Sequence, residues 1–263
     1  MDLQLQSKTA FISGSTQGIG YAIAQQLLAE GATVIINGRN QAKIDAAIQK
    51  LRQEIPQAEV LGIAADFSDV EQVNALIGTL PQVDILIHNV GVFELRDFID
   101  ITDEQWLSIF EINVMSSIRL SRVLFPKMME RGWGRVLFIS SESGVNIPEN
   151  MIHYGMTKTA LLSISNGLSK LTKNTQVTVN SIVGGPTYSD GVAEVVSRIA
   201  RAQQLSEAQM KELVIQNTNP TSLLQRFINP SEIANMAVYL CSPLSSATNG
   251  AVTRVDGGVL TAL

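Results

Sequence analysis

Residues 9–30, TAFISGSTQGIGYAIAQQLLAE, decide the fold. The apolar run Thr9–Ser13 has the side chains of a buried strand, and residues 19–30 have the apolar period of a helix. The turn between them is rich in glycine, which has no Cβ atom and lets a phosphate group approach backbone N–H groups at the positive end of a helix. Strand, glycine turn and helix in this order predict a dinucleotide-binding unit. The predicted phosphate loop consists of Gly14, Ser15, Thr16, Gln17, Gly18, Ile19 and Gly20.

The rest of the chain repeats this alternation of short apolar runs and longer amphipathic segments. Further strand-like runs are Thr33–Asn37, Val60–Ala64, Ile85–Asn89, Arg135–Ser140, Val177–Val183 and Ala251–Val255. The helical segments lie near residues 19–30, 41–54, 69–79, 103–130, 152–172 and 230–241. Right-handed helical crossovers make such strands parallel and bury both faces of their sheet. The sequence therefore predicts a single α/β domain over residues 1–263, a Rossmann fold with a seven-stranded parallel sheet, helices on both faces and the ligand at the carboxyl ends of the strands.

One interval, residues 187–229, interrupts the alternation. It contains two amphipathic stretches, Val192–Gln203 and Glu207–Gln216, without a strand between them. Their apolar faces consist of Val192, Val195, Val196 and Ile199, and of Met210, Leu213 and Val214. We expect a helical insertion at the ligand edge of the sheet that acts as a substrate lid. The alternative is plain packing of both helices against the domain.

The composition argues against several classes of function. The 263 residues are 45% hydrophobic and 16% charged, and the net charge of −5 offers no basic surface for nucleic acid. One cysteine and two histidines leave no Cys/His set for a metal, and we expect Cys241 to be a buried structural thiol. The first residues, MDLQLQSKTAF, have no pattern of an export or transit signal, so we expect a cytoplasmic protein without membrane association.

The end of the second strand distinguishes between two dinucleotides. A carboxylate there accepts hydrogen bonds from the ribose 2′-OH of NAD and repels the 2′-phosphate of NADP. This chain has Gly38 at that place, followed by the planar cation of Arg39, which favours NADP(H) over NAD(H). An ordinary surface arginine is the alternative. Asp66 and Phe67, just after the third strand, are placed to contact the adenine, although Asp66 also suits the cap of a helix that starts near Ser68.

Three polar residues form a candidate catalytic centre. Tyr154 and Lys158 are four residues apart in a predicted helix and therefore project from one face. An ammonium group near a phenol favours the phenolate, so we expect Lys158 to lower the pKa of Tyr154 and to let it exchange a proton as a hydride moves. Ser141 ends the fifth strand, where its hydroxyl can hold a substrate oxygen and stabilise negative charge on it.

These motifs resemble those of the short-chain dehydrogenase/reductase family, and the likeness extends over nearly the whole chain, from the glycine loop to residues 255–258. The loop glycines have the family's Gly-x-x-x-Gly-x-Gly spacing, and Asn89-Val90-Gly91 is similar to the family's Asn-Ala-Gly element beside the adenosine ribose. Residues 184–189 resemble the loop that holds the nicotinamide carboxamide. The cofactor contacts that the resemblance implies outside the glycine loop are Asn89, Gly91, Tyr154, Lys158, Gly185, Thr187 and Ser189.

The resemblance also implies catalytic roles. Ser141 resembles the family's catalytic serine, Tyr154 its acid/base, and Lys158 the residue that binds the nicotinamide ribose and lowers the tyrosine pKa. Asn113 is similar to the asparagine that holds a water molecule of the proton relay. The implied activity is NADP(H)-dependent hydride transfer between a carbonyl and an alcohol carbon, in the direction of ketone reduction because NADP(H) pools are usually kept reduced.

Several positions depart from the family pattern. Gln17 replaces a basic residue that often helps to bind the 2′-phosphate, which weakens the case for NADP(H). His88 stands where many relatives have asparagine, and Gly184 where they have proline, which leaves the nicotinamide loop less rigid. His153 directly precedes Tyr154, and we expect it to pack or face solvent rather than contact the substrate.

The sequence leaves the substrate open, because an apolar lid suits acyl thioesters, steroids, cyclic ketones and quinones alike. A 3-oxoacyl-[acyl-carrier-protein] reductase is one expectation, and its acidic carrier protein needs a basic patch. The candidates for that patch are Arg119, Arg122, Lys127 and Arg131. The same cations also suit ion pairs at a subunit interface of a homotetramer or homodimer.

Other functions fit the same fold. A catalytically silent NADP-binding regulator would usually have lost one of the three catalytic residues, and an NAD-dependent alcohol dehydrogenase would use the same residues with the other dinucleotide. A sugar-nucleotide epimerase or dehydratase would usually need a larger carboxyl-terminal region and a different glycine spacing than this chain has.

Overall fold

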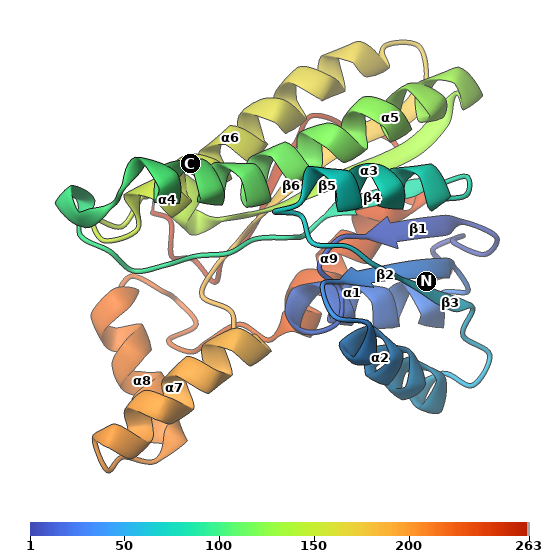
Figure 1. The fold of residues 1–263 in the computed structure, drawn as a ribbon. Coiled ribbons are helices and arrows are strands. Elements are labelled where there is room, and N and C mark those ends of the chain that lie inside the picture. Colours follow the sequence, from blue (N-terminus) through green and yellow to red (C-terminus); the bar gives the residue numbers. More distant parts are fainter. Residues whose placement is uncertain (262–263) are drawn as a thin grey trace.

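The computed structural model describes residues 1–261, and within them seven strands form one parallel sheet (Figure 1). The strands are β1 (Thr9–Ile12), β2 (Thr33–Gly38), β3 (Val60–Ala64), β4 (Ile85–His88), β5 (Trp133–Ser141), β6 (Gln176–Gly184) and β7 (Val252–Val255). Their order in the sheet is β3-β2-β1-β4-β5-β6-β7, so the chain changes direction across the sheet between β1 and β4. Doubly wound sheets bind ligands outside the carboxyl ends of the strands at such a switch point. The predicted sheet is confirmed.

Helices cover both faces of the sheet (Figure 1). The helices before the insertion are α1 (Gly18–Ala29), α2 (Gln41–Glu54), α3 (Val70–Thr79), α4 (Asp103–Phe110), α5 (Ser116–Arg131) and α6 (Ile152–Ser169), and α9 (Pro230–Cys241) follows it. Apolar residues of α1, α2 and α9 form one core with the sheet, and those of α3, α5 and α6 form the other. Within residues 1–261, no helix has the length and the apolar character that crossing a membrane requires.

The segment 103–130, predicted as one helix, is divided in the structure. Its first part, α4, ends at Phe110, a π-helical turn covers Glu111–Met115, and α5 then continues to Arg131. The turn contains Asn113, whose side chain is fully buried. A π turn leaves the chain helical, so the apolar period alone does not reveal it, and such turns are frequent at functional sites.

The insertion forms a helical hairpin of α7 (Asp190–Ala202) and α8 (Glu207–Thr218), which stands away from the sheet in Figure 1. Its apolar faces pack mainly against each other, with Val196, Ala200 and Met210 buried between them. The hairpin is tied at its base, because the N–H of Tyr188 donates to the carbonyl of Ile228 at 2.9 Å and the N–H of Ile228 donates to the carbonyl of Pro186 at 2.8 Å. The expected helical insertion is present, and its movement as a lid stays a prediction.

Candidate active site

The glycine loop joins β1 to α1 beside the switch point of the sheet. Gly14 and Gly18 have φ angles of 61° and 62°, in the left-handed region that other residues avoid. At Gly20 a Cβ atom would lie 2.5 Å from Nδ2 of Asn89 and 2.6 Å from the carbonyl oxygen of Gly14. The loop can fold this tightly only with glycine at these places, as its predicted phosphate-binding role requires.

Two buried or half-buried asparagines hold the loop in place. The amide of Asn89 donates to the carbonyl oxygens of Ser13 at 3.1 Å and Gly14 at 2.7 Å. Asn37, at the end of β2, accepts from the N–H of Gly14 at 3.1 Å and donates to the carbonyl of Ile63 at 3.0 Å. Asn89 was expected beside the cofactor and supports the loop, whereas Asn37 was not predicted. The available signal was a polar residue inside an otherwise apolar strand.

Of the remaining loop residues, one is buried and supports the loop, and three are at least partly exposed. Ser15 is fully buried, and its hydroxyl donates to the carbonyl of Ile12 at 2.7 Å and accepts from the N–H of Asn37 at 3.0 Å. Its side chain therefore supports the loop from within. Thr16 and Ile19 are partly exposed, and Gln17 is exposed.

The start of the insertion contacts the glycine loop. The N–H of Gly18, the first residue of α1, donates to the carboxylate of Asp190 at 2.7 Å. This contact shows that the positive end of α1 accepts an anion. Ser189, expected near the nicotinamide, lies beside the phosphate loop, since its Cβ is 3.3 Å from where a Cβ on Gly18 would be. Thr187 donates its hydroxyl to the carbonyl of Gly185 at 2.9 Å and so shapes the loop after β6.

The three residues expected near the adenosine of the cofactor differ in their exposure and contacts. Arg39 is exposed, and its Nη1 lies 4.0 Å from the carboxylate of Asp66. Asp66 accepts from the N–H of Ser68 at 2.9 Å, but the cap of α3 is Asp69, so the suggested capping role of Asp66 is wrong. The side chain of Phe67 is 3% exposed and packs in the core, and the contact of this residue with the adenine stays a prediction.

The structure brings the candidate catalytic residues together. Ser141 ends β5, and Tyr154 and Lys158 lie one turn apart on α6. The Nζ of Lys158 is 5.6 Å from the ring centre of Tyr154 and donates to the carbonyl of Ile139 at 3.0 Å. A Cβ atom on Gly91 would lie 3.0 Å from this Nζ. The segment after β4 therefore packs closely against the ammonium group of Lys158.

Asn113 connects this group to the rest of the fold. Its amide donates to the carbonyl of Val92 at 2.9 Å and to the hydroxyl of Thr157 at 3.0 Å, and its oxygen accepts from the N–H of Val92 at 2.8 Å. The π turn therefore fixes both the segment after β4 and the helix that carries Tyr154 and Lys158. Holding a water molecule of a proton relay stays a prediction for Asn113, and the part of Thr157 was not foreseen.

The pKa values correct one expectation. Burial, together with the nearby charge of Glu142, raises the pKa of Tyr154, and contact with the Ser141 hydroxyl opposes this only in part. The pKa of Tyr154 is thus raised overall, opposite to the net lowering expected from Lys158. Burial lowers the pKa of Lys158 itself to about 8, and its ammonium donates to a backbone carbonyl. A phenol that stays protonated at neutral pH can act as a proton donor.

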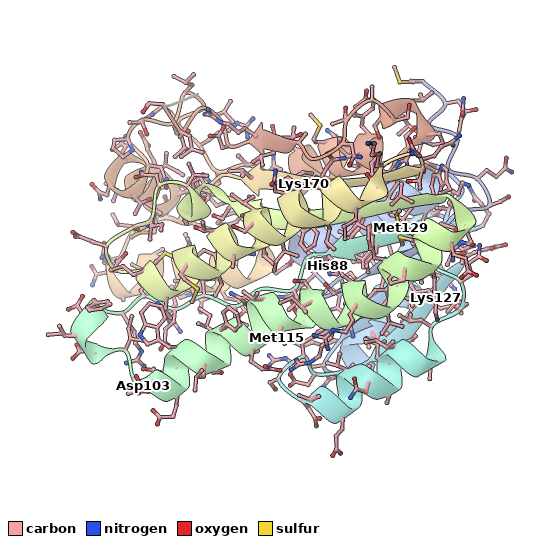
Figure 2. The ribbon with its side chains drawn as sticks, turned by 90° about the horizontal axis from the view of Figure 1, so that it is seen from above. His88, Asp103, Met115, Lys127, Met129 and Lys170 are labelled. Atoms are coloured by element: carbon pink, nitrogen blue, oxygen red, sulfur yellow. The ribbon has the colours of Figure 1, made fainter. Side chains whose placement is uncertain are left out.

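Both histidines are packing residues. His153 is 1% exposed, and its ring lies 5.9 Å from that of Trp106, so the packing expected for it is confirmed. His88 lies beneath α5 and α6, which run side by side in Figure 2, and its Nε2 is 2.8 Å from the hydroxyl of Ser121. The expected burial of Cys241 is also confirmed, and burial raises the pKa of its thiol to about 12.

We predict that His88 makes the fold sensitive to acid. Burial lowers the pKa of His88 from 6.5 to about 3. The unfolded state therefore binds a proton more readily than the folded state, and the free energy of unfolding falls as the pH decreases from 6.5 toward 3. The loss between pH 7 and pH 5 is about 2 kcal/mol. In urea unfolding at these two pH values, His88→Gln should lose less stability than the wild type by about this amount. An equal loss in both proteins would show that His88 does not titrate in this way.

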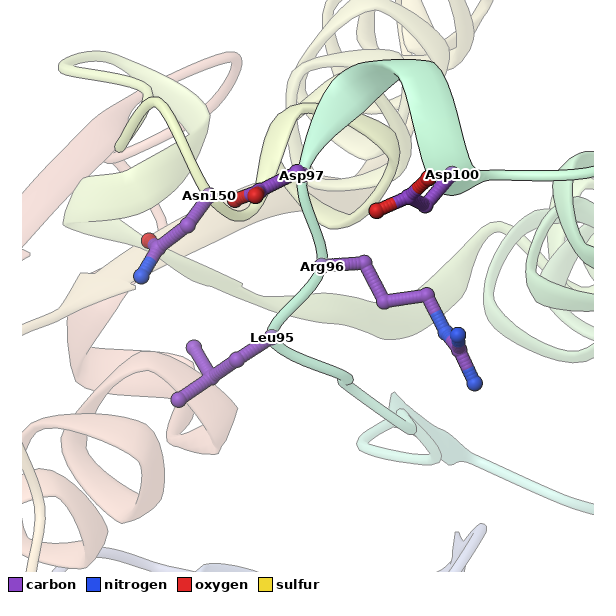
Figure 3. A pocket seen from close by; sticks show the side chains of 5 residues that line it. All are labelled: Leu95, Arg96, Asp97, Asp100 and Asn150. Atoms are coloured by element: carbon purple, nitrogen blue, oxygen red, sulfur yellow. The ribbon is translucent and has the colours of Figure 1, made fainter.

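The hollow shown in Figure 3 is formed by the segment after β4 and the loop before α6, and its lining is mostly polar. It has a volume of about 330 Å³ and is lined by Leu95, Arg96, Asp97, Asp100 and Asn150. Its walls are joined by the N–H of Arg96, which donates to the carbonyl of Asn150 at 2.9 Å. The candidate catalytic side chains do not line it, so we assign no step of the chemistry to this hollow.

The chain is similar to known proteins over its full length. Residues 14–260 match the family model described as Enoyl-(Acyl carrier protein) reductase. The uncharacterized oxidoreductase YvrD of Bacillus subtilis is 46% identical over 267 residues, covering 100% of both chains. The 3-oxoacyl-[acyl-carrier-protein] reductase FabG of Aquifex aeolicus is 28% identical, covering 98% of this chain and 100% of FabG. The solved structure of L-sorbose reductase from Gluconobacter frateurii with NADPH and L-sorbose has a TM-score of 0.93 and 29% identity, covering 100% of both chains.

Proposed function

Since the chain belongs to the short-chain dehydrogenase/reductase family, and is thus an oxidoreductase, we propose that it transfers a hydride from NADPH to the carbonyl carbon of a small molecule. The observation that carries the proposal is the group formed by Ser141, Tyr154 and Lys158 at the carboxyl ends of the strands. A hydroxyl, a protonated phenol and an ammonium group at one place suit an oxygen atom that gains negative charge and then a proton.

The residues at the switch point fit NADP(H). The N–H of Gly18, at the positive end of α1, already holds a carboxylate, which supports an anion such as a pyrophosphate at this place. Arg39, exposed at the end of β2, would hold the 2′-phosphate. When bound, the dinucleotide supplies the hydride. NADPH in the similar structure of L-sorbose reductase supports this choice.

In the proposed reduction, Tyr154 gives its phenolic proton to the carbonyl oxygen while the carbon receives the hydride. Ser141 donates a hydrogen bond to the same oxygen and so stabilises the charge that develops on it. The ammonium group of Lys158, 5.6 Å from the centre of the tyrosine ring, stabilises the phenolate until it regains a proton. Asn113 positions α6 and the segment after β4 around this reaction.

A carrier-bound acyl group is a weaker candidate than a free ketone, although a similar protein is a 3-oxoacyl-[acyl-carrier-protein] reductase. Of the four cations expected to attract a carrier protein, Arg119 pairs with Glu111, and Arg131 lies 3.6 Å from the carboxylate of Asp84. Ion pairs within the chain leave less positive charge for an acidic partner. The homo-oligomer, the cytoplasmic location and the lid stay predictions.

The function is tested by following NADPH absorbance with the purified protein and a panel of carbonyl compounds. The panel contains acetoacetyl thioesters, cyclic ketones, quinones, steroid ketones and α-hydroxy ketones, each also run with NADH. We expect oxidation of NADPH with at least one ketone and slower oxidation of NADH. Turnover of thioesters alone would favour the acyl reductase. If neither NADPH nor NADH is oxidised with any compound, the result would favour a regulator that binds NADP without catalysis.

A further inference from the structure

An acidic residue lies directly beside the proposed catalytic serine. The hydroxyl of Ser141 donates to Oε2 of Glu142, and the same oxygen accepts from the N–H of Ser143 at 2.8 Å. The charge of Glu142 also adds to the burial that raises the pKa of Tyr154, and it partly offsets the burial that lowers the pKa of Lys158. Its carboxylate therefore lies beside the serine whose hydroxyl is proposed to bind the substrate carbonyl.

This hydrogen bond conflicts with the proposed role of Ser141. A serine hydroxyl has one proton, and in the structure that proton is given to Glu142. It is then not available to the carbonyl oxygen of a substrate. When the hydroxyl of Ser141 turns to the carbonyl, the carboxylate loses one hydrogen bond, and a substrate that donates to the carboxylate offsets this loss.

The carboxylate has a place for such a donor. Within the part of the chain that the structure describes, Oε1 of Glu142 has no hydrogen-bond partner, whereas Oε2 has two. Two exposed apolar side chains lie in the segments that adjoin this group. Phe93 is 50% exposed, with its ring centre 6.1 Å from that of Tyr154, and Val145, in the segment after Glu142, is 54% exposed. The surroundings of the reacting group thus combine one strong acceptor with apolar contacts.

We propose that Glu142 determines specificity, and that it selects ketones with a hydroxyl on the carbon next to the carbonyl and an apolar group on the other side. The inference rests on the proposed carbonyl reduction. The substrate hydroxyl donates to Oε1 of Glu142 and so replaces the hydrogen bond that the carboxylate loses when the hydroxyl of Ser141 turns to the carbonyl oxygen. Carbonyl and hydroxyl oxygens on adjacent carbons lie close enough to reach two groups that are themselves hydrogen-bonded. A substrate without the hydroxyl leaves Ser141 bound to Glu142.

The test compares three ketones that differ at one position: α-hydroxyacetophenone, α-methoxyacetophenone and acetophenone. The methoxy compound keeps the electron-withdrawing oxygen but has no proton to donate, so it separates recognition from intrinsic reactivity. With the wild type we expect kcat/KM for the hydroxy ketone to exceed that for the methoxy ketone by about tenfold or more, as for a hydrogen bond to a charged group.

The variant Glu142→Gln should remove this preference. The amide oxygen is needed by the N–H of Ser143, so the NH₂ group takes the place of Oε1 and has no lone pair for the substrate hydroxyl. We expect the ratio of kcat/KM for the hydroxy ketone to that for the methoxy ketone to fall about tenfold, whatever the change common to all three ketones. Glu142→Ala should give the same loss of preference. Glu149→Gln removes the same charge from an exposed place on the same loop and should behave as the wild type.

The outcomes separate this inference from the proposed function. Equal kcat/KM values for the hydroxy and methoxy ketones in the wild type would overturn the inference and leave carbonyl reduction standing. Unchanged preference in both Glu142 variants would also overturn it. If other carbonyl compounds oxidise NADPH and the hydroxy ketone does not, the selected substrate class is wrong. If no carbonyl compound leads to oxidation of NADPH, the proposed function itself is overturned.

Discussion

Tyr154→Phe is expected to lower kcat for ketone reduction by about 10²- to 10⁴-fold, the usual contribution of a general acid. The change removes one oxygen atom and with it the proton that the carbonyl oxygen receives. The pKa of Tyr154 is raised by burial, so the wild-type phenol carries this proton at neutral pH. NADPH affinity, measured by fluorescence quenching, should change little, because the variant keeps the aromatic ring and removes only the hydroxyl.

A matched variant separates this loss from general damage. Tyr239→Phe makes the same chemical change on α9, where the side chain is 38% exposed, and should retain full activity. If Tyr154→Phe reduces ketones as fast as the wild type while unfolding at the same urea concentration, the proton comes from another group, and the mechanism proposed for Ser141 and Lys158 has to be rebuilt.

Local patterns were sufficient to predict the sheet and the glycine loop. The strands of a parallel sheet are apolar on both faces because helices bury both, and this produces the short apolar runs from which each strand was inferred. Gly14 and Gly18 have the left-handed backbone that only a glycine-rich turn provides easily. Tyr154 and Lys158 were paired correctly because their contact depends only on helix geometry.

Features that depend on contacts distant in sequence could not be predicted in this way. Asp190 reaches the N–H of Gly18 across 172 positions, and no local signal connects the two. The π turn at Asn113 leaves the apolar period intact. The pKa of Tyr154 was misjudged because the sequence showed the nearby cation but neither the burial nor the partner that Lys158 finds at Ile139. Glu142 was missed because an acid next to a serine forms no recognised pattern.

Arg39→Asp is expected to reverse the dinucleotide preference. The guanidinium is exposed at the end of β2, 4.0 Å from the carboxylate of Asp66. Its replacement removes the cation that would pair with the 2′-phosphate and leaves two carboxylates there, which repel a phosphate and can accept from a ribose 2′-OH. The ratio of kcat/KM with NADPH to that with NADH should fall about hundredfold or more, as for a charged hydrogen bond together with charge repulsion.

The position of the new carboxylate matters for this experiment. Gly38 is the place where NAD-dependent proteins carry their acid, but a Cβ atom there would lie 2.7 Å from Cγ2 of Thr16 in the glycine loop. Substitution at Gly38 would therefore disturb the phosphate loop, whereas Arg39 is free to change. Lys173→Asp makes the same charge change on an exposed residue just before the amino-terminal end of β6, three strands beyond β1 in the sheet, and should leave the ratio unaltered. If the ratio is unaltered in Arg39→Asp as well, another group reads the 2′-phosphate, and the ion pair with Asp66 is only a surface contact.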